Sequence, residues 1–264
     1  MNNWTELFRT DDGEPVFNGN FNNYSLTQTI ARSTVNNPLF PQEGSRISLS
    51  VQFTLPYSLF NRDTDYSELP VDERFRWLEY HKWRFNAEWY QTLVGKLVLK
   101  ADARIGMIAS YNDEIGISPF ERFQLGGDGL NNQQFGQFNG TDIISSRGYE
   151  INEFEANTGS DGTVVATPIF NKYTVELRYP ISLNPNSTIF VTAFAQGANA
   201  WSSYRDYNPF EMNRSVGMGL RVFLPMFGML GFDYALGFDK NAPETGNFFS
   251  RYGDFNIILG FEPE

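Results

Sequence analysis

Residues 215–224 read Ser-Val-Gly-Met-Gly-Leu-Arg-Val-Phe-Leu, and apolar side chains alternate with small or polar ones along this stretch without a break. Successive side chains of a β-strand point to opposite faces, so the stretch predicts a strand with one apolar face. Arg221 stands in the middle of the other face, where a charge needs water or a partner. A membrane β-barrel, with lipid outside and a wet lumen inside, satisfies both faces.

The same period of two recurs along most of the chain. Clear patterns occur at 47–55, 82–90, 97–107, 173–179, 230–238 and 254–261, and weaker ones at 24–35 and 189–196. In the last of these, Phe190 and Phe194 share the face of Thr192 and Gln196. Together with 215–224 these segments predict nine strands, and no segment has a convincing amphipathic-helix pattern.

Composition excludes several classes of protein. The 264 residues contain no cysteine, which rules out disulfides, thiolate chemistry and cysteine-ligated metal sites. The single histidine, His81, fits a polar residue at a strand end better than a catalytic group, and no nucleophile–base pair, metal cluster or phosphate loop is evident. We therefore expect no enzyme, no cofactor and no metal site. The net charge of −11 argues against a nucleic-acid partner.

The connections between the predicted strands alternate between short and long. The short ones are 36–45, 91–95, 181–187 and 225–228, and the long ones are 56–78, 110–172, 199–213 and 239–253. Outer-membrane barrels have short periplasmic turns and long outside loops. A soluble β-sandwich also has alternating strands, but this rhythm and the charged residues on the polar faces favour the barrel. Counting back from a periplasmic C-terminus places residues 1–23 outside, and an odd strand number predicts that further strands precede this chain.

The longest connection carries two phrases that resemble a known family. Glu121-Arg122-Phe123-Gln124-Leu125-Gly126-Gly127 is followed by Ser145-Ser146-Arg147-Gly148-Tyr149. They resemble Glu-x-Phe-x-x-Gly-Gly and Val-Arg-Gly-Phe/Tyr of the outer-membrane insertase superfamily, specifically the C-terminal half of a BamA-type barrel assembly factor. Ser146 replaces the valine, and the insertion at 130–144 is longer than the family pattern.

The resemblance continues on both sides of this loop and covers about residues 24–261. Further similar phrases occur, in order, at 39–46, 176–180, 194–201, 215–225 and 231–235. Within them Gln196 stands where the family usually has an acidic residue. A lone Arg-Gly-aromatic tripeptide is a weak signal, whereas this ordered series of phrases at strand spacing is a specific one.

The resemblance implies an all-β fold, an antiparallel transmembrane β-barrel of which this chain supplies about nine C-terminal strands out of roughly sixteen. Residues 24–110 and 173–264 would be barrel strands, and 111–172 would be an outside loop inserted into the lumen. The loop would be clamped to the wall by Arg147, which pairs with Glu176 and approaches Gln196, while Gly148 forms the tip and Tyr149 packs it. The implied loop base is Glu121, Phe123, Gly126 and Gly127. The implied seam strand carries Phe255, Ile257, Leu259, Gly260 and Phe261.

The function implied by the resemblance is the folding and insertion of β-barrel proteins into the outer membrane of a Gram-negative bacterium. The implied partners are nascent outer-membrane β-barrel proteins, outer-membrane lipids and accessory lipoproteins of an assembly complex. Two alternatives remain open. One is a secretion transporter or pore of the same superfamily, and the other is a short member that lacks periplasmic domains.

Overall fold

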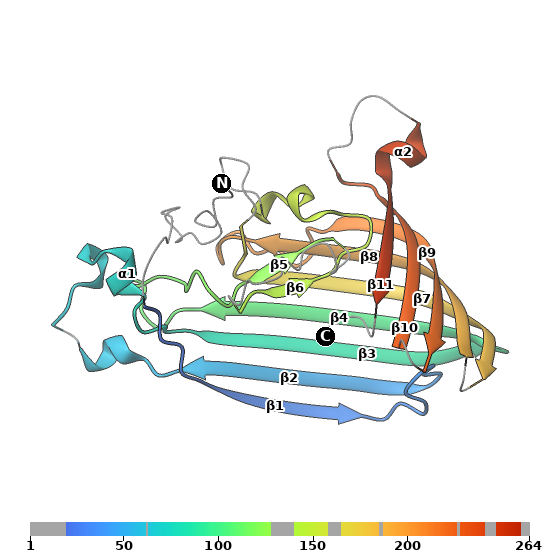
Figure 1. The fold of residues 1–264 in the computed structure, drawn as a ribbon, viewed down its shortest axis with the longest axis horizontal. Helices are drawn as coiled ribbons and strands as arrows, with labels where there is room; N and C mark the ends of the chain where they lie inside the picture. The colour runs from blue at the N-terminus through green and yellow to red at the C-terminus, as the bar shows by residue number, and fades with distance from the viewer. Residues whose placement is uncertain are drawn as a thin grey trace.

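The computed structural model describes residues 20–61, 63–127, 140–157, 165–184, 187–225, 228–240 and 247–259. Nine strands form one antiparallel sheet in which chain neighbours pair, and this confirms the predicted fold class and strand number. They are β1 (Ser25–Ser33), β2 (Gly44–Thr54), β3 (His81–Val94), β4 (Leu97–Ala109), β7 (Ile169–Asn184), β8 (Ser187–Trp201), β9 (Asn213–Leu224), β10 (Gly228–Gly237) and β11 (Gly253–Leu259). Figure 1 shows the sheet strongly curved around the connection between β4 and β7. Among the described residues β1 and β11 are the two edges and do not pair with each other.

The remaining elements lie in the long connections. Between β2 and β3 are η2 (Tyr57–Phe60), η3 (Tyr66–Glu68) and α1 (Val71–Arg74). The connection from β4 to β7 contains the parallel pair β5 (Phe123–Leu125) and β6 (Asp142–Ile144), followed by η4 (Ile151–Glu153) and η5 (Glu155–Asn157). The helix α2 (Phe248–Tyr252) precedes β11. Within the described ranges no helix has the length and apolar character needed to cross a membrane.

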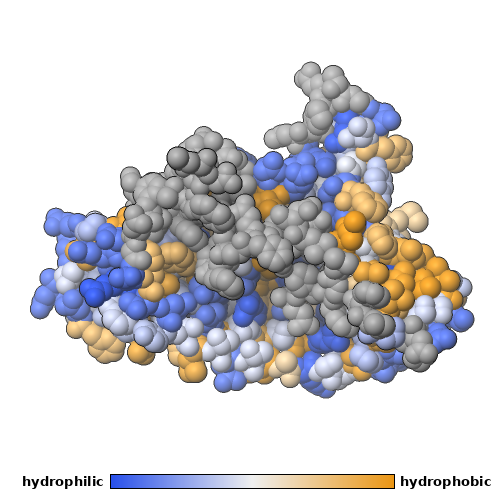
Figure 2. All heavy atoms as spheres, in the orientation of Figure 1, coloured by the Kyte–Doolittle hydropathy of each residue, from blue (hydrophilic) through white to orange (hydrophobic). Residues whose placement is uncertain are grey.

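The two faces of the sheet differ as the alternation predicts. Arg221 and Asp233 are buried on the concave face, whereas Phe232 and Tyr234 are exposed on the convex face. Leu220 lies on the convex side and is partly exposed. Apolar atoms gather over the outward faces of the strands at the right of Figure 2. A convex apolar face and a concave charged face are what a lipid-facing wall and a lumen require.

Two apolar layers fill the concave side at different heights. At the short-turn end, Phe40 from the β1–β2 connection packs with Tyr90, Val98, Phe190 and Met229, and we call this set the floor cluster. At the other end, residues of the β4–β7 connection pack on the upper parts of the strands, and we call this set the loop core. Its buried members are Phe75, Leu78, Tyr80, Ile108, Ile115, Phe123, Leu125, Ile144, Tyr149, Phe154, Phe170, Ala198 and Ala200.

A charged layer separates these two clusters. Along β4, Val98 belongs to the floor cluster and Ile108 to the loop core, and the buried residues Lys100, Asp102 and Arg104 lie between them. Buried charges persist only when they are paired and hydrogen-bonded. The middle of the concave face therefore holds a layer of buried, paired charges.

Some predicted boundaries differ from the structure. Strand β7 begins at Ile169, four residues before the predicted 173, and continues past Pro180 to Asn184. The predicted connection 181–187 is therefore too long. The register of β7 against β8 shifts between Pro180 and Ser182, because a bulge accommodates a proline that cannot donate a ladder hydrogen bond. Similarly, β3 runs to Val94, so the predicted connection 91–95 shrinks to a turn at 95–96.

Candidate functional site

The tip of the β4–β7 connection lies buried inside the concave face. Ser146 lies beside Gly127, donating its N–H to the carbonyl of Gly127 at 3.1 Å, while Gly127 donates to the carbonyl of Tyr149 at 2.8 Å. Gly148 has a φ of 84°, a left-handed conformation that glycine adopts without the penalty a Cβ incurs. The two sequence motifs of this connection are thus hydrogen-bonded to each other. Gly127 at the loop base fixes the turn that carries Arg147.

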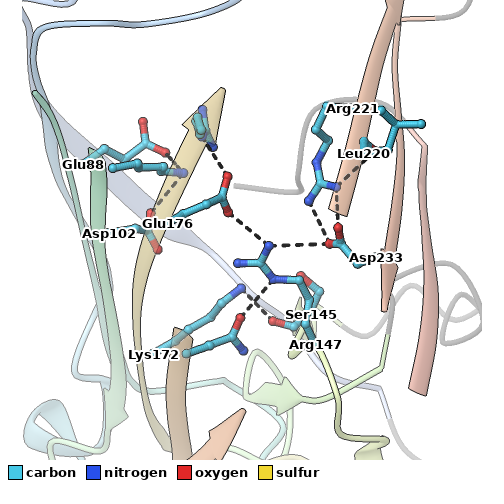
Figure 3. A network of polar contacts seen from close by, with 12 residues as sticks. Glu88, Asp102, Ser145, Arg147, Lys172, Glu176, Leu220, Arg221 and Asp233 are labelled. Carbon is cyan, nitrogen blue, oxygen red and sulfur yellow. Dashed lines mark hydrogen bonds and ion pairs between the residues drawn. The ribbon is translucent and has the colours of Figure 1, made fainter. Parts of the chain in front are cut away.

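Arg147 reaches three strands from the inside of the sheet. Its Nη1 lies 3.1 Å from Oε2 of Glu176 in β7, and its Nε lies 3.3 Å from Oε1 of Gln196 in β8. The same Nη1 lies 3.5 Å from Oδ2 of Asp233 in β10. Figure 3 shows the guanidinium between the two carboxylates. The structure therefore brings together Arg147, Glu176 and Gln196, and adds Asp233.

Each carboxylate has a second arginine. Nε of Arg178 lies 2.7 Å from Glu176, and Arg221 binds both oxygens of Asp233 at 2.5 and 2.8 Å. The charges therefore alternate in the order Arg178, Glu176, Arg147, Asp233, Arg221. Fork-shaped guanidinium groups match carboxylates geometrically, so this chain of ion pairs is well formed for a buried setting.

The alternation in 230–238 puts Asp233 on the polar face of its strand, but the sequence analysis did not connect this residue to Arg147. The alternation of side chains along a strand identifies which residues face inward. It does not say which of them meet, because the curvature of the sheet brings β10 across from β7. An acidic residue of inward parity was the signal available in the sequence.

The guanidinium also rests on an aromatic ring that the sequence analysis did not assign. Cζ of Arg147 lies 3.5 Å from the ring centroid of Phe194, a distance at which the ring quadrupole attracts the cation. Gln196 donates to Oγ of Ser146 at 3.0 Å, and Lys172 donates to the carbonyl of Ser145 at 2.8 Å. Backbone and side chain of the tip are thus both held by the wall.

Tyr149 fixes the other side of the tip. Its hydroxyl donates to the carbonyl of Arg214 at 2.8 Å and accepts from the backbone N–H of Asp239 at 2.9 Å. Burial of the phenol raises the pKa of Tyr149 to about 12, so it stays a hydrogen-bond donor. The tip fits because Gly237 lacks a side chain: a Cβ there would lie 2.4 Å from the carbonyl oxygen of Gly148.

The loop base is anchored separately. Oε1 of Glu121 accepts from Asn23 at 3.0 Å, and Oε2 lies 3.6 Å from Nζ of the buried Lys82. Glu121 has a φ of 63°, unusual for a residue other than glycine. Phe123 is buried against Phe170 with ring centroids 4.8 Å apart. Gly126 donates its N–H to the carbonyl of Ile144 at 2.9 Å. All four residues of the predicted loop base thus make contacts that hold the β4–β7 connection in place.

The predicted seam strand is an edge of the sheet. Strand β11 pairs with β10 over 230–236 and 253–259. Phe255 and Ile257 are exposed on the convex face, and Leu259 pairs with Leu230. Gly260 and Phe261 lie outside the described residues, as do the insertion residues 130–139 and most of the predicted outside segment 1–23.

Comparison with known proteins assigns the family. The model of the Omp85 superfamily domain matches residues 7–260. The chain belongs to the Omp85 superfamily. A search of curated proteins found no match.

A protein of known structure has a similar fold. It is the crystal structure of BamA from Haemophilus ducreyi lacking POTRA domains 1–3, with a TM-score of 0.59 and 18% sequence identity. The match covers 89% of this chain and 41% of that one, so the chain spans about two-fifths of the length of the BamA chain. The predicted resemblance to part of a BamA-type barrel is confirmed.

Proposed function

We propose that this chain is part of a factor that folds and inserts β-barrel proteins into the outer membrane of a Gram-negative bacterium. The observation that carries the proposal is the buried Arg147, which ties β7, β8 and β10 together from inside. The membership in the Omp85 superfamily supports the membrane setting. The proposed activity is not enzymatic, since it consists of templating strand pairing.

The physical task of such a factor is to keep strand edges satisfied. An unpaired edge exposes N–H and C=O groups, and each group left unsatisfied in hydrocarbon costs several kcal/mol. A curved sheet with an edge strand, such as β11, offers a row of partners to an incoming strand. For that edge to stay in place while it exchanges partners, the rest of the wall must keep its curvature.

The clamp is suited to this requirement. Glu176 and Asp233 lie on strands separated by β8 and β9, so one guanidinium bridges a wide arc of the wall. Withdrawal of the loop would leave Glu176 and Asp233 with one arginine each, Arg178 and Arg221, and would remove the cation that they share. Loss of this shared cation opposes withdrawal of the loop and flattening of the sheet. Nascent barrel proteins and outer-membrane lipids are the partners this role requires, and accessory lipoproteins would deliver the former.

The test compares Arg147→Ala with Arg205→Ala in the full-length protein. Arg205 lies exposed in the β8–β9 connection and serves as a matched control for loss of an arginine. Purified variants in lipid vesicles are given an unfolded barrel protein, and its folding is followed by its heat-sensitive shift in gel mobility. We expect a loss of folding activity for Arg147→Ala and none for Arg205→Ala.

Two results would contradict the proposal. One is an Arg147→Ala protein that is itself folded and assembles the substrate at the normal rate. The other is a wild-type protein that exports a passenger polypeptide but does not accelerate barrel folding, which would favour the secretion transporter.

A further inference from the structure

The connection between β2 and β3, residues 55–80, exposes large apolar side chains, and we call it the rim loop. Phe60 is 80% exposed, Leu55 57% and Leu59 50%. Trp77 near its end and Tyr24 just before β1 are exposed as well. A contiguous apolar patch of this kind on a protein surface marks a contact with another phase or molecule.

The apolar patch is held in a defined shape. Trp77 lies between two rings, with its centroid 6.0 Å from that of Tyr24 and 5.2 Å from that of Tyr57. The backbone on both sides of Trp77 is hydrogen-bonded to Asn22. The N–H of Asn22 donates to the carbonyl of Arg76 at 2.9 Å, and its carbonyl accepts from the N–H of Leu78 at 3.0 Å. The patch is therefore preorganised and does not have to be ordered on binding.

A buried carboxylate holds the η2 turn in place through hydrogen bonds. Glu79 is 2% exposed and accepts from Oγ of Ser58 at 2.8 Å and from the backbone N–H of the same residue. Burial raises the pKa of Glu79, and the bonds from Ser58 act in the opposite direction. The turn that carries Leu59 and Phe60 is thus fixed to the start of β3.

The apolar patch continues the convex face of the barrel wall. Phe53 is exposed on that face of β2, and Leu55 follows two residues later, which is the spacing of one strand face. Leu26 in β1 and Trp83 in β3 extend the same surface sideways. The rest of the rim loop is charged and acidic on balance, with Asp63, Asp65, Glu68, Asp72 and Glu73 against Arg62, Arg74 and Arg76. The left margin of Figure 2 shows this division, with pale orange atoms below hydrophilic ones.

We propose that the rim loop is an interfacial anchor that seats η2 in the headgroup region of the bilayer beside β1–β3. Aromatic residues collect at the membrane–water interface because their rings are apolar and their edges are polar. The acidic segment of the loop stays in water above it. The occupant of the patch is the lipid surface, as its continuity with the lipid-facing wall requires. This inference rests on the membrane setting of the Omp85 barrel and not on the assembly activity.

The chain contains no cysteine, so single cysteines can carry a nitroxide label in the full-length protein, with any cysteine elsewhere replaced. Four variants in phosphatidylcholine vesicles are compared: Leu59→Cys, Phe60→Cys, Asp63→Cys and Val175→Cys. Val175 is exposed on the convex face of β7 and reports lipid, whereas the exposed Asp63 reports water. Electron paramagnetic resonance measures the access of oxygen, which concentrates in lipid, against that of a water-soluble nickel complex.

We expect labels at 59 and 60 to favour oxygen, as the label at 175 does, and the label at 63 to favour nickel. Nickel access at 60 equal to that at 63 would overturn the anchor. Protection of 59 and 60 from both reagents would also overturn it, because the patch would then face a protein. The label at 175 verifies that the barrel is inserted, so the result does not depend on whether the protein assembles other barrels.

Discussion

At the scale of single residues, the site depends as much on absent side chains as on charges. Gly217 leaves room for the ring of Phe194, since a Cβ there would lie 2.5 Å from its Cζ. Gly219 leaves room for the carboxylate of Asp233. Gly237 faces the backbone of the tip itself. Backbone cannot rotate away as a flexible side chain can, so Gly237 tolerates a methyl group poorly. The same holds for Gly217, where a Cβ would also lie 2.4 Å from the carbonyl oxygen of Tyr234.

Gly237→Ala should therefore dislodge the tip. The new methyl group would meet the carbonyl of Gly148 and the ring of Tyr149, at 2.4 and 3.0 Å. We expect faster cleavage of the β4–β7 connection in limited proteolysis. Gly197→Ala is the control, because its methyl group would meet only the flexible side chain of Met212. Equal cleavage of both variants and the wild type would show that the tip is not seated on Gly237.

The two carboxylates of the charge chain should each be needed for stability. Glu176→Gln removes the carboxylate that Arg178 and Arg147 share, and Asp233→Asn removes the one that Arg221 and Arg147 share. Loss of one partner of a buried ion pair costs ~3–5 kcal/mol. Arg214→Gln breaks an ion pair whose arginine side chain is 70% exposed, where screening by solvent leaves little net stabilisation. Unfolding in urea from lipid vesicles would measure the difference. Similar decreases in the free energy of unfolding in all three variants would contradict the expectation that the buried ion pairs matter more than the exposed one.

At the scale of elements, sequence reasoning succeeded where the signal is local. Period-two alternation predicts each strand of the nine-stranded sheet and its inward face, because the pleat repeats every two residues. It does not predict the short strands β5 and β6 of the long connection. It failed at Pro180, where a bulge lets the strand continue. The site residues on the loop followed from the family resemblance together with parity. Phe194 and Asp233 could not be assigned as contacts of Arg147, because the depth of the loop and the curvature of the sheet are non-local.

The loop base should respond to pH through Glu121. Burial raises the pKa of this carboxyl, and Lys82 opposes the shift. A group whose pKa is raised on folding stabilises the fold below its ordinary pKa of about 4.3 and loses that contribution as the pH rises through the folded value. Glu121→Gln has no titrating carboxyl, so the stability of the variant does not fall in this way as the pH rises. We expect the Tm of the variant relative to wild type to increase from acidic to neutral pH, whereas a constant difference would contradict the assignment.

At the scale of the whole molecule, the sheet has two unpaired edges in the described residues, β1 and β11. Every residue of β1 is exposed. Free edges seek partners, so the 264-residue chain alone should associate in detergent. Size-exclusion chromatography with light scattering over a range of concentrations checks this. A monodisperse monomer at all concentrations would show that the edges are satisfied in another way.

The floor cluster has an electrical consequence. It places apolar side chains across the short-turn end of this part of the lumen, and Phe40 contacts Phe190 with ring centroids 5.1 Å apart. A hydrophobic constriction excludes water and therefore insulates. In the full-length protein in a planar bilayer, Phe40→Ser should raise the leak current, whereas Phe210→Ser, at a loop position that is 86% exposed, should not. On this view Phe40 acts as a seal that keeps this part of the lumen from conducting ions.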